Sequence, residues 1–296
     1  MAKAENHIYR VDPDGFYGEL FVPEQDNYPK KALICFSGSD GGIELARTLA
    51  GVFQSHGLTT LALAYVLEEG LPNQFSKVPI DCLEAAAKRL HAMGYEKVGL
   101  WGISKGAELA LVAGSLLPGL VNAVIAVATM NTVCQGFVKD KGIAFIPGSS
   151  WSFHGKELPY SSYTTEKFPL WSILKKSIQI QDVTMYDLYE PLVQNPAPGA
   201  EIKAEQITEP VLLINSKMDN MWPSELAAEK IMKRLKDHNF PYSYEHLSYD
   251  YGSHMFVPMY LPSARLFKGD RGKNKEKGLK ARLDSLTKTL EFVSKR

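Results

Sequence analysis

One serine in the sequence stands between two glycines, where an apolar run meets a helix-like segment. The stretch is Gly102-Ile103-Ser104-Lys105-Gly106, which follows "KVGLW" and opens "KGAELALVAGSLL". A strand-to-helix turn of this kind strains its central residue, and glycines two positions to either side avoid collisions with the neighbouring strand and helix. The hydroxyl then projects at a helix N-terminus, which favours developing negative charge. We therefore take Ser104 as a candidate nucleophile.

A plain turn that needs small residues would show the same pattern, so the serine requires partners. A serine nucleophile needs a general base and a carboxylate that orients the base. Asp219 lies just past the apolar run "PVLLIN" and is the only acid between positions 212 and 222. Ahead of an expected helix near 223, the same aspartate would serve equally well as a helix cap or a surface residue.

The base is best assigned to His254. This residue ends "YDYGSH", a glycine loop between the last expected strand and the terminal helix. The chain order serine, acid, histidine, with the acid and histidine on loops after later strands, is typical of one arrangement of this chemistry. The other histidines suit it less, because they fall before the fold, near helix ends, in a strand or in an insertion: His7, His56, His91, His154, His238 and His246.

A tetrahedral intermediate also needs backbone N–H donors for its oxyanion. One donor is expected from Lys105, the residue after the nucleophile, and the second from the loop after "KALICF". In that loop, Ser37-Gly38-Ser39-Asp40-Gly41-Gly42, we favour Ser39, with Asp40 next. Its glycines match neither a dinucleotide-binding fingerprint nor a P-loop.

The elements that position these residues predict an α/β fold with a mostly parallel sheet. Continuous apolar runs predict strands that are covered on both faces, at 31–37, 59–65, 96–102, 122–128 and 210–215. Helical periodicity lies between them, at 44–56, 79–93 and 104–116. Alternating strands and helices predict right-handed crossovers and helices on both faces of the sheet.

The ends of the chain add further elements. Two alternating runs, "HIYRV" and "GFYGELFVP", are separated by Asp12-Pro13-Asp14-Gly15 and predict an opening hairpin. A helix from about Pro223, a strand "PYSYEHLSY" and a basic helix from about 277 to 295 close the fold. The basic stretch 268–280 is expected to be a solvated loop.

The segment 131–208 interrupts this alternation. It is rich in proline, glycine and aromatic residues and has one helix-like patch near 167–178, so we expect a cap insertion within a single domain spanning 1–296. Its aromatic residues either line an acyl pocket or form the cap's own core, and we favour the core. These residues are Trp151, Phe153, Tyr160, Tyr163, Phe168 and Trp171.

Composition narrows the classes of function. The 296 residues are 45% hydrophobic and 22% charged, with 33 basic and 33 acidic side chains, so no global field would attract nucleic acid or a membrane. The polar start and the lack of a long apolar segment predict a cytoplasmic protein. Oligomeric state stays open, and the expected partner is a small molecule.

The spacing of cysteines, histidines and acids in the sequence does not indicate a metal or cofactor site. Cys35, Cys82 and Cys134 are scattered and are expected to be buried thiols. There is no metal-binding spacing of histidines or acids, so neither metal nor cofactor is expected. Ser172-Ile173-Leu174-Lys175 matches S-x-x-K, but the partner motifs of penicillin-binding enzymes are missing and we regard the match as chance.

Several stretches in order resemble the C-terminal domain of the acyl-CoA thioesterase and bile acid-CoA:amino acid N-acyltransferase family, from about Gly15 to the end. They are "FSGSDGGIELARTLAGVFQSHGLTTLALAY", "LPNQFSKVPIDCLEAAAKRL", "VGLWGISKGAELAL", "PVLLINSKMDNMWPSELAAEKI" and "YDYGSHMFVPMY". The resemblance implies an α/β-hydrolase with nucleophile Ser104, acid Asp219 and base His254. Two departures stand out: animal members carry a β-sandwich domain before the hydrolase, and the family has two acids where this chain has Met218-Asp219.

From the residues and the resemblance together we expect a serine hydrolase that cleaves acyl thioesters through an acyl-enzyme on Ser104. Lys105 and the basic stretch 268–280 are candidates for contact with coenzyme A phosphates. The alternatives are a carboxylesterase or dienelactone-hydrolase-like enzyme without coenzyme A specificity, an N-acyltransferase, and a binding protein of hydrolase fold without activity. A serine at the turn favours hydrolysis over transfer to an amino acid.

Overall fold

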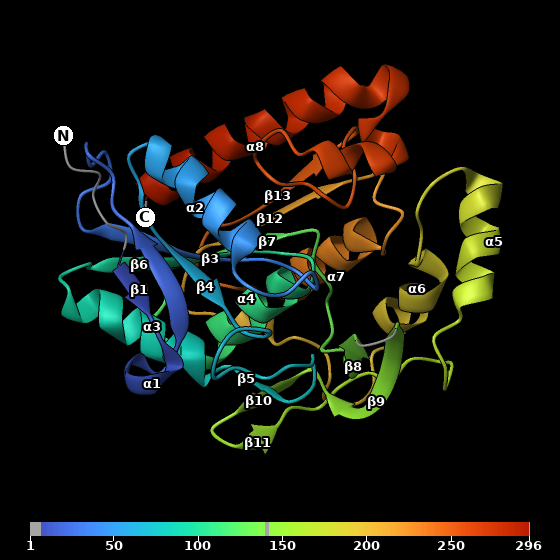
Figure 1. Cartoon of the computed structure of the whole chain (residues 1–296), viewed down its shortest axis with the longest axis horizontal. Helices are drawn as coiled ribbons and strands as arrows, with labels where there is room; N and C mark the ends of the chain where they lie inside the picture. Colours follow the sequence, from blue (N-terminus) through green and yellow to red (C-terminus); the bar gives the residue numbers. More distant parts are fainter. Residues whose placement is uncertain (1–6, 140–141, 296) are drawn as a thin grey trace.

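The protein is described here from a computed structural model that covers residues 7–139 and 142–295. Its centre is an eight-stranded sheet in the order β1-β2-β4-β3-β6-β7-β12-β13 (Figure 1). The strands are β1 (His7–Tyr9), β2 (Tyr17–Phe21), β3 (Lys31–Phe36), β4 (Thr59–Ala64), β6 (Lys97–Ile103), β7 (Ala123–Val127), β12 (Val211–Ser216) and β13 (Tyr244–Tyr249). The five apolar runs expected as strands are thus confirmed.

Six neighbouring strands of the sheet run parallel. The pairs β4–β3, β3–β6, β6–β7, β7–β12 and β12–β13 are all parallel, whereas β1 and β2 add an antiparallel edge beside β4. Because carboxyl ends of parallel strands meet at one edge of a sheet, the loops after β3, β6, β12 and β13 gather there. Those loops carry all the candidate site residues.

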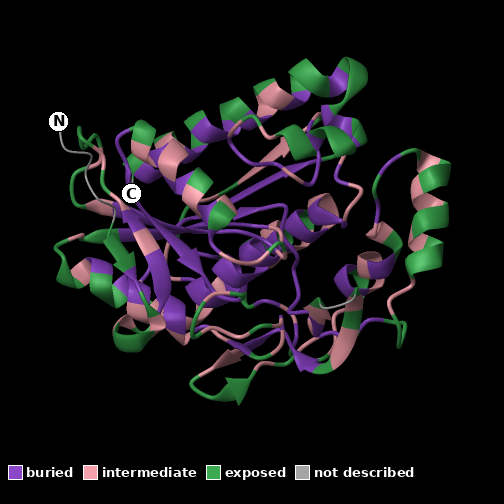
Figure 2. Cartoon of the chain, in the orientation of Figure 1, coloured by how far each residue is buried: buried purple, intermediate pink, exposed green. Residues whose placement is uncertain are grey.

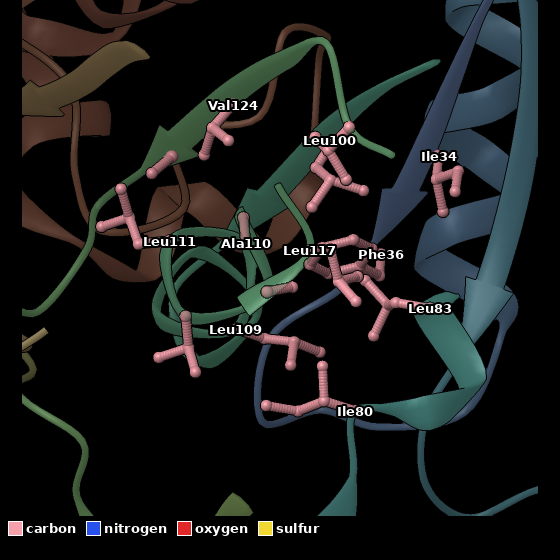
Figure 3. Close-up of a cluster of buried hydrophobic side chains, with 14 of the residues drawn as sticks. Ile34, Phe36, Ile80, Leu83, Leu100, Leu109, Ala110, Leu111, Leu117 and Val124 are labelled. Carbon is pink, nitrogen blue, oxygen red and sulfur yellow. The ribbon is translucent and has the colours of Figure 1, made fainter. Parts of the chain in front are cut away.

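Helices cover both faces of the sheet, as predicted. Helices α2 (Glu44–Ser55) and α8 (Lys275–Ser294) supply buried residues to one core cluster, and α3 (Asp81–Ala92), α4 (Lys105–Leu116) and α7 (Ser224–Asp237) supply them to the other. Figure 3 shows the second cluster, where Leu83 of α3 and Leu109 of α4 pack near Phe36 and Leu100 of the sheet. Burial of these apolar surfaces is the main force that holds the layers together.

The opening hairpin is confirmed, with one addition. β1 and β2 pair antiparallel with Tyr9 opposite Gly18, and the connection between them holds a short helix, α1 (Val11–Asp14). Gly15 follows it with a φ of 82°, a left-handed conformation that glycine adopts without steric cost.

The segment 131–208, which we call the cap, holds more regular structure than its sequence indicated. The helix-like patch is α5 (Leu170–Ile180), and α6 (Tyr186–Gln194) and the short helix η1 (Ala204–Gln206) were not expected. Neither were its strands: β8 (Gln135–Lys139), β9 (Ile143–Ser149), β10 (Trp151–Phe153) and β11 (Lys156–Glu157). β10 and β11 were missed because they are very short, and β10 also depends on pairing with β5 (Val78–Pro79), far away in the sequence. β9 has seven residues, but Pro147 and Gly148 within it are unusual inside a strand.

The description of 268–280 as a solvated loop was wrong in part. Its lysines are exposed, but Gly269 and Asp270 are buried in the short helix η3 (Lys268–Asp270) and Gly278 is buried near the start of α8. Two further short helices, η2 (Pro262–Leu266) and η4 (Gly272–Asn274), flank η3. The Asp270 carboxylate lies 2.9 Å from the Arg282 guanidinium, and both are buried. A Cβ on Gly269 would lie 1.6 Å from the carbonyl oxygen of Gly252, so this stretch packs directly on the loop that carries His254.

The three cysteines are free and buried, as expected. Burial raises the pKa of the Cys82 thiol to about 12, which keeps it protonated at neutral pH. Within the residues described, no group of three or more histidine, cysteine or acidic side chains is placed to hold a metal ion. Over the same residues, none of the helices combines the length and the apolar content needed to cross a membrane.

Candidate active site

Ser104 occupies a sharp turn between β6 and α4. Its backbone angles are φ 58° and ψ −124°, a strained conformation for a residue with a side chain, and its N–H donates to Val127 of β7. A Cβ on Gly102 would lie 2.2 Å from the carbonyl oxygen of Gly106, and one on Gly106 would lie 2.2 Å from that of Ser37. Both glycines are therefore required by close backbone packing, as the sequence predicted.

The structure brings Ser104, His254 and Asp219 into one line. The Ser104 hydroxyl lies 2.8 Å from Nε2 of His254, and Nδ1 of His254 lies 2.9 Å from Oδ2 of Asp219. The histidine and the aspartate are both buried. With Nδ1–H donating to the carboxylate, Nε2 is free to accept the serine proton, which is the tautomer that a general base needs.

Asp219 is held in place by further donors. The backbone N–H groups of Met221 and Trp222 donate to Oδ1 at 2.9 and 3.3 Å, and the Ser224 hydroxyl donates to Oδ2 at 2.6 Å. Helix α7 begins only at Ser224, with Pro223 preceding it, so the alternative of Asp219 as the helix cap or a surface residue is wrong.

Two residues beside this line were not singled out for a role by reasoning from the sequence alone. The Trp222 ring meets the His254 ring edge-on, with centroids 5.2 Å apart, and its indole N–H donates to the carbonyl of Ala128 at 2.9 Å. Ser224 bonds the carboxylate as described. Their position, three and five residues after Asp219, was a signal in the sequence, and the Asp-x-x-Trp spacing of Asp219 and Trp222 is also part of the family resemblance.

The loop after β3 runs close beside the serine. A Cβ on Gly38 would lie 2.9 Å from the Cβ of Ser104, and the Tyr65 hydroxyl fixes this loop by donating to the Gly38 carbonyl at 2.7 Å. Ser39 and Lys105 both line the cavity in front of Ser104. Their backbone N–H groups as oxyanion donors remain a prediction.

Asp40 and Lys139 both line this cavity. Asp40 is partly open to solvent, yet desolvation by the surrounding protein raises the pKa of its carboxyl group. Hydrogen bonds from its own backbone N–H, the Ser37 hydroxyl and the Gly38 backbone oppose this rise, and nearby Lys139 opposes it to a smaller extent. The Lys139 ammonium donates to the Ser39 carbonyl.

The cavity has a volume of about 250 Å³ and is walled mainly by apolar side chains. Three methionines line it, and unbranched methionine side chains adapt to ligands of different shape. The apolar and aromatic lining residues are Leu45, Ile103, Phe137, Tyr163, Met185, Tyr189, Met221, Trp222, Met255 and Phe267.

The expected contact of Lys105 with substrate phosphates is wrong. Its ammonium is buried and donates to both carboxylate oxygens of Glu108, at 2.9 and 2.8 Å. Glu108, which is fully buried, also accepts from the Trp151 indole at 2.7 Å and from the Cys134 backbone at 3.1 Å. This buried pair faces inward and ties α4 to the cap.

The remaining histidines lie away from Ser104. His246 donates from Nε2–H to Oδ1 of Asn215 within the sheet, and burial lowers its pKa. His154 is exposed and contacts Glu84 at 2.9 Å. His7 is in β1, His91 in α3, and His56 and His238 follow the ends of α2 and α7.

The cap aromatics serve more than one purpose. Trp151 is fully buried and belongs to the main core cluster, and Phe145 and Phe168 contact a smaller cluster around buried Tyr163. Tyr163 also lines the cavity, so for this residue the core and the pocket are not alternatives. Trp171 is 82% exposed and belongs to neither, so its assignment to the cap's core was wrong.

A mostly parallel sheet with a serine on a sharp strand-to-helix turn (the nucleophile elbow), an acid after β12 and a histidine after β13 defines the α/β-hydrolase fold. Solved structures agree. A dienelactone hydrolase-like promiscuous phosphotriesterase from metagenomic libraries aligns over 99% of this chain and 98% of its own, with a TM-score of 0.54 and 14% identity. A putative dienelactone hydrolase from Klebsiella pneumoniae aligns over 91% of each chain, with a TM-score of 0.53 and 15% identity. At such identities the likeness concerns the fold alone.

The family is identified by sequence. The model described as BAAT / Acyl-CoA thioester hydrolase C terminal matches residues 83–268, and the chain belongs to this family. Among curated relatives, acyl-coenzyme A thioesterase 2 of Mus musculus, a mitochondrial protein, is 28% identical over 248 residues, which are 82% of this chain and 48% of the relative. Acyl-coenzyme A thioesterase 1 of Homo sapiens is 26% identical over 251 residues, 84% of this chain and 54% of the relative. The chain spans about half the length of these relatives.

Proposed function

We propose that this chain is a serine hydrolase that cleaves acyl thioesters through an acyl-enzyme on Ser104. The observation that carries the proposal is the line from the Ser104 hydroxyl through His254 to Asp219, with separations of 2.8 and 2.9 Å, at the floor of an apolar cavity. Two hydrogen bonds in this order supply a nucleophile, its base and the group that orients the base.

In the first half of the reaction, the Ser104 oxygen attacks the acyl carbonyl while Nε2 of His254 takes the serine proton. The carbonyl π electrons move to oxygen, and the N–H groups of Lys105 and Ser39 stabilise the resulting oxyanion. When the carbonyl re-forms, the carbon–sulfur bond breaks and His254 gives its proton to the departing thiolate. Asp219 stabilises the imidazolium throughout without taking the proton itself.

In the second half, water attacks the ester formed on Ser104. His254 takes a proton from the water, a second tetrahedral intermediate forms, and its collapse breaks the bond to the serine oxygen. The serine regains its proton from His254 and the carboxylic acid leaves. Each half uses the same donors and the same base, so one set of side chains serves both.

The acyl group is expected to occupy the apolar cavity. Its walls offer methionine and aromatic surface, and no metal or cofactor is required by the steps above. Membership of the acyl-CoA thioester hydrolase family and the thioesterase relatives support a thioester of coenzyme A as the substrate class. Because the chain spans only half of those relatives, their substrates are carried over as part of this proposal.

The test combines a variant with a chemical probe. S104A is expected to lower turnover by about 10³-fold or more, since the residual rate comes from binding and oxyanion stabilisation alone. A fluorophosphonate should label the wild type at Ser104 and leave S104A unlabelled. An unchanged rate in S104A, or no labelling of active wild type, would rule out the acyl-enzyme. Absence of both labelling and hydrolysis would favour a binding protein instead.

A second candidate is an esterase without coenzyme A specificity. It is favoured by the buried Lys105–Glu108 pair. Because Lys105, the lysine next to Ser104 in the sequence, is buried and paired, it is not accessible to the phosphates of coenzyme A. A panel of acyl-CoAs and p-nitrophenyl esters with matched acyl chains separates the two. A clear preference for acyl-CoA supports the first candidate, and equal or better cleavage of the simple esters supports the second.

A further inference from the structure

Among the helices of eight or more residues in the described part of the chain, only α5 has no buried residue. It has 11 residues, all of them described, and none is buried, although six are apolar. Figure 2 shows it in the colours of intermediate and exposed residues only, at the margin of the molecule. Most helical stability comes from packing an apolar face, so an apolar helix that packs so little presents surface to something else.

The exposed apolar residues form one stripe on the outer side of α5. Leu170, Leu174 and Ile178 recur every four residues and are 51%, 42% and 77% exposed. Trp171, beside them, is 82% exposed. Residues spaced by four lie on one face of a helix, and Trp171 widens that face to an arc of about 100°.

Basic side chains border this stripe. The helix carries Lys175 and Lys176 and no acid. At its C-terminal end, Arg271 donates to the carbonyls of Gln181 and of Leu266, which brings the exposed Leu266 and the guanidinium beside the helix.

The acids near α5 are already engaged. Asp187 pairs with Lys176 at 3.3 Å. Asp182 is buried and accepts from Asn220 and from the backbone of Lys268. Glu166 precedes the helix next to Lys167, so the two cancel. Hydrogen bonds from uncharged donors do not neutralise Asp182, but the three cations Lys175, Lys268 and Arg271 outnumber this one acid. They leave a local positive charge near the stripe, which the zero net charge of the whole chain conceals.

We propose that the outer face of α5, which consists of Leu170, Trp171, Leu174 and Ile178, docks on the surface of an anionic lipid bilayer. A helix with tryptophan and leucine on one face and lysine beside it is suited to the boundary between headgroups and acyl chains. Phospholipid anions complement Lys175, Lys268 and Arg271. A second copy of the chain docked through the same face would instead bring these cations together, which opposes association.

The opposite side of α5 faces a second cavity of about 140 Å³. Ile173 and Lys176 line it together with Met185, and Met185 also lines the cavity in front of Ser104. Docking through α5 would thus hold the cap, and the site behind it, against the bilayer where amphipathic acyl compounds collect. The docking itself does not depend on the proposed hydrolysis.

The sequence supplies a built-in reporter for this docking. All four tryptophans lie in the described part of the chain, and Trp101, Trp151 and Trp222 are buried, so Trp171 alone is freely exposed. Phosphatidylcholine–phosphatidylserine vesicles should shift tryptophan emission to shorter wavelength and carry the full chain upward in a flotation gradient. Both effects should weaken in pure phosphatidylcholine and at high salt, because basic residues contribute to binding.

Three variants make the test specific. W171F should float but lose the emission shift, and I178E should reduce the floated fraction about tenfold or more, because a charge replaces buried apolar surface. L283E is the matched control: Leu283 is 47% exposed on α8, far along the chain from α5, and its variant should float like the wild type. Equal thermal melting and equal cleavage of a small soluble ester would show that I178E is folded.

Two results would overturn the proposal. One is wild-type protein that stays at the bottom of the gradient with every vesicle composition. The other is a dimer, measured by light scattering without lipid, that I178E dissociates; this result would assign the face to a second copy of the chain.

Discussion

Glu108 on helix α4 accepts a 2.7 Å hydrogen bond from the indole N–H of Trp151 in the cap. Both of its carboxylate oxygens also accept from the ammonium of Lys105, the residue after the candidate nucleophile. All three side chains are buried. One carboxylate thus joins the helix that follows Ser104 to the cap. A buried ion pair of this kind adds little net stability, but breaking it leaves an unpaired charge.

E108Q should therefore destabilise the protein by about 3–5 kcal/mol, because the Lys105 ammonium loses its counter-charge while it remains buried. The measurement is the free energy of unfolding in urea. K105M/E108Q is the matched comparison, since it removes both charges and the glutamine oxygen can still accept from Trp151. The double variant should recover most of the loss; a double variant as unstable as E108Q would show that charge pairing is not the cause.

The glycines of the elbow give a second prediction. G106A should destabilise the protein by about 1–3 kcal/mol or more and abolish activity, because its Cβ would lie 2.2 Å from the Ser37 carbonyl and displace the loop beside Ser104. G51A is the control, since Gly51 lies in α2 with open space around it and its alanine should stabilise the helix by about 0.5–1 kcal/mol. Thermal melts and ester cleavage measure both effects. Full activity in G106A would contradict the packing described here.

Much of the fold was predictable because its signals are local. Continuous apolar runs marked the buried strands, and the elbow spacing marked Ser104, since both patterns follow from packing within a few residues. The sequence order also placed Asp219 and His254 at the correct edge of the sheet, because parallel strands end together.

What could not be predicted depends on contacts between distant residues. The strand β10 exists through its pairing with β5, about 70 positions earlier, and the burial of the Lys105–Glu108 pair depends on Trp151 and Cys134, which arrive with the cap and donate to Glu108. The packing of Gly269 on Gly252 likewise has no local signal. The lysine-rich stretch 268–280 was therefore predicted to be a solvated loop, although its small residues are buried.

The orientation of the base gives a third prediction. D219N should lower turnover by about 10⁴-fold, as in serine proteases with the same arrangement, because an amide favours the wrong tautomer of His254. S224A should lower turnover far less, since Asp219 keeps its bonds from His254, Met221 and Trp222. Steady-state kinetics compare the two variants, with circular dichroism as a check on folding. Equal losses would mean that the hydroxyl of Ser224, and not the charge of Asp219, governs the site.

The pH dependence of stability is expected to report on His246, far from Ser104 in the sheet. Burial lowers its pKa below the ordinary value of 6.5, despite Glu225 and Glu229 nearby. Between pH 6.5 and the lowered pKa, the unfolded chain binds a proton at His246 that the folded protein does not. The free energy of unfolding therefore falls as the pH drops from about 6.5 through the lowered pKa.

The variant H246Q removes this titration. In urea unfolding, it should lose less stability than the wild type between pH 7 and pH 5. H238Q is the control, because His238 is exposed at the end of α7 and its variant should follow the wild type. Parallel pH curves for H246Q and the wild type would show that His246 takes up its proton equally in both states.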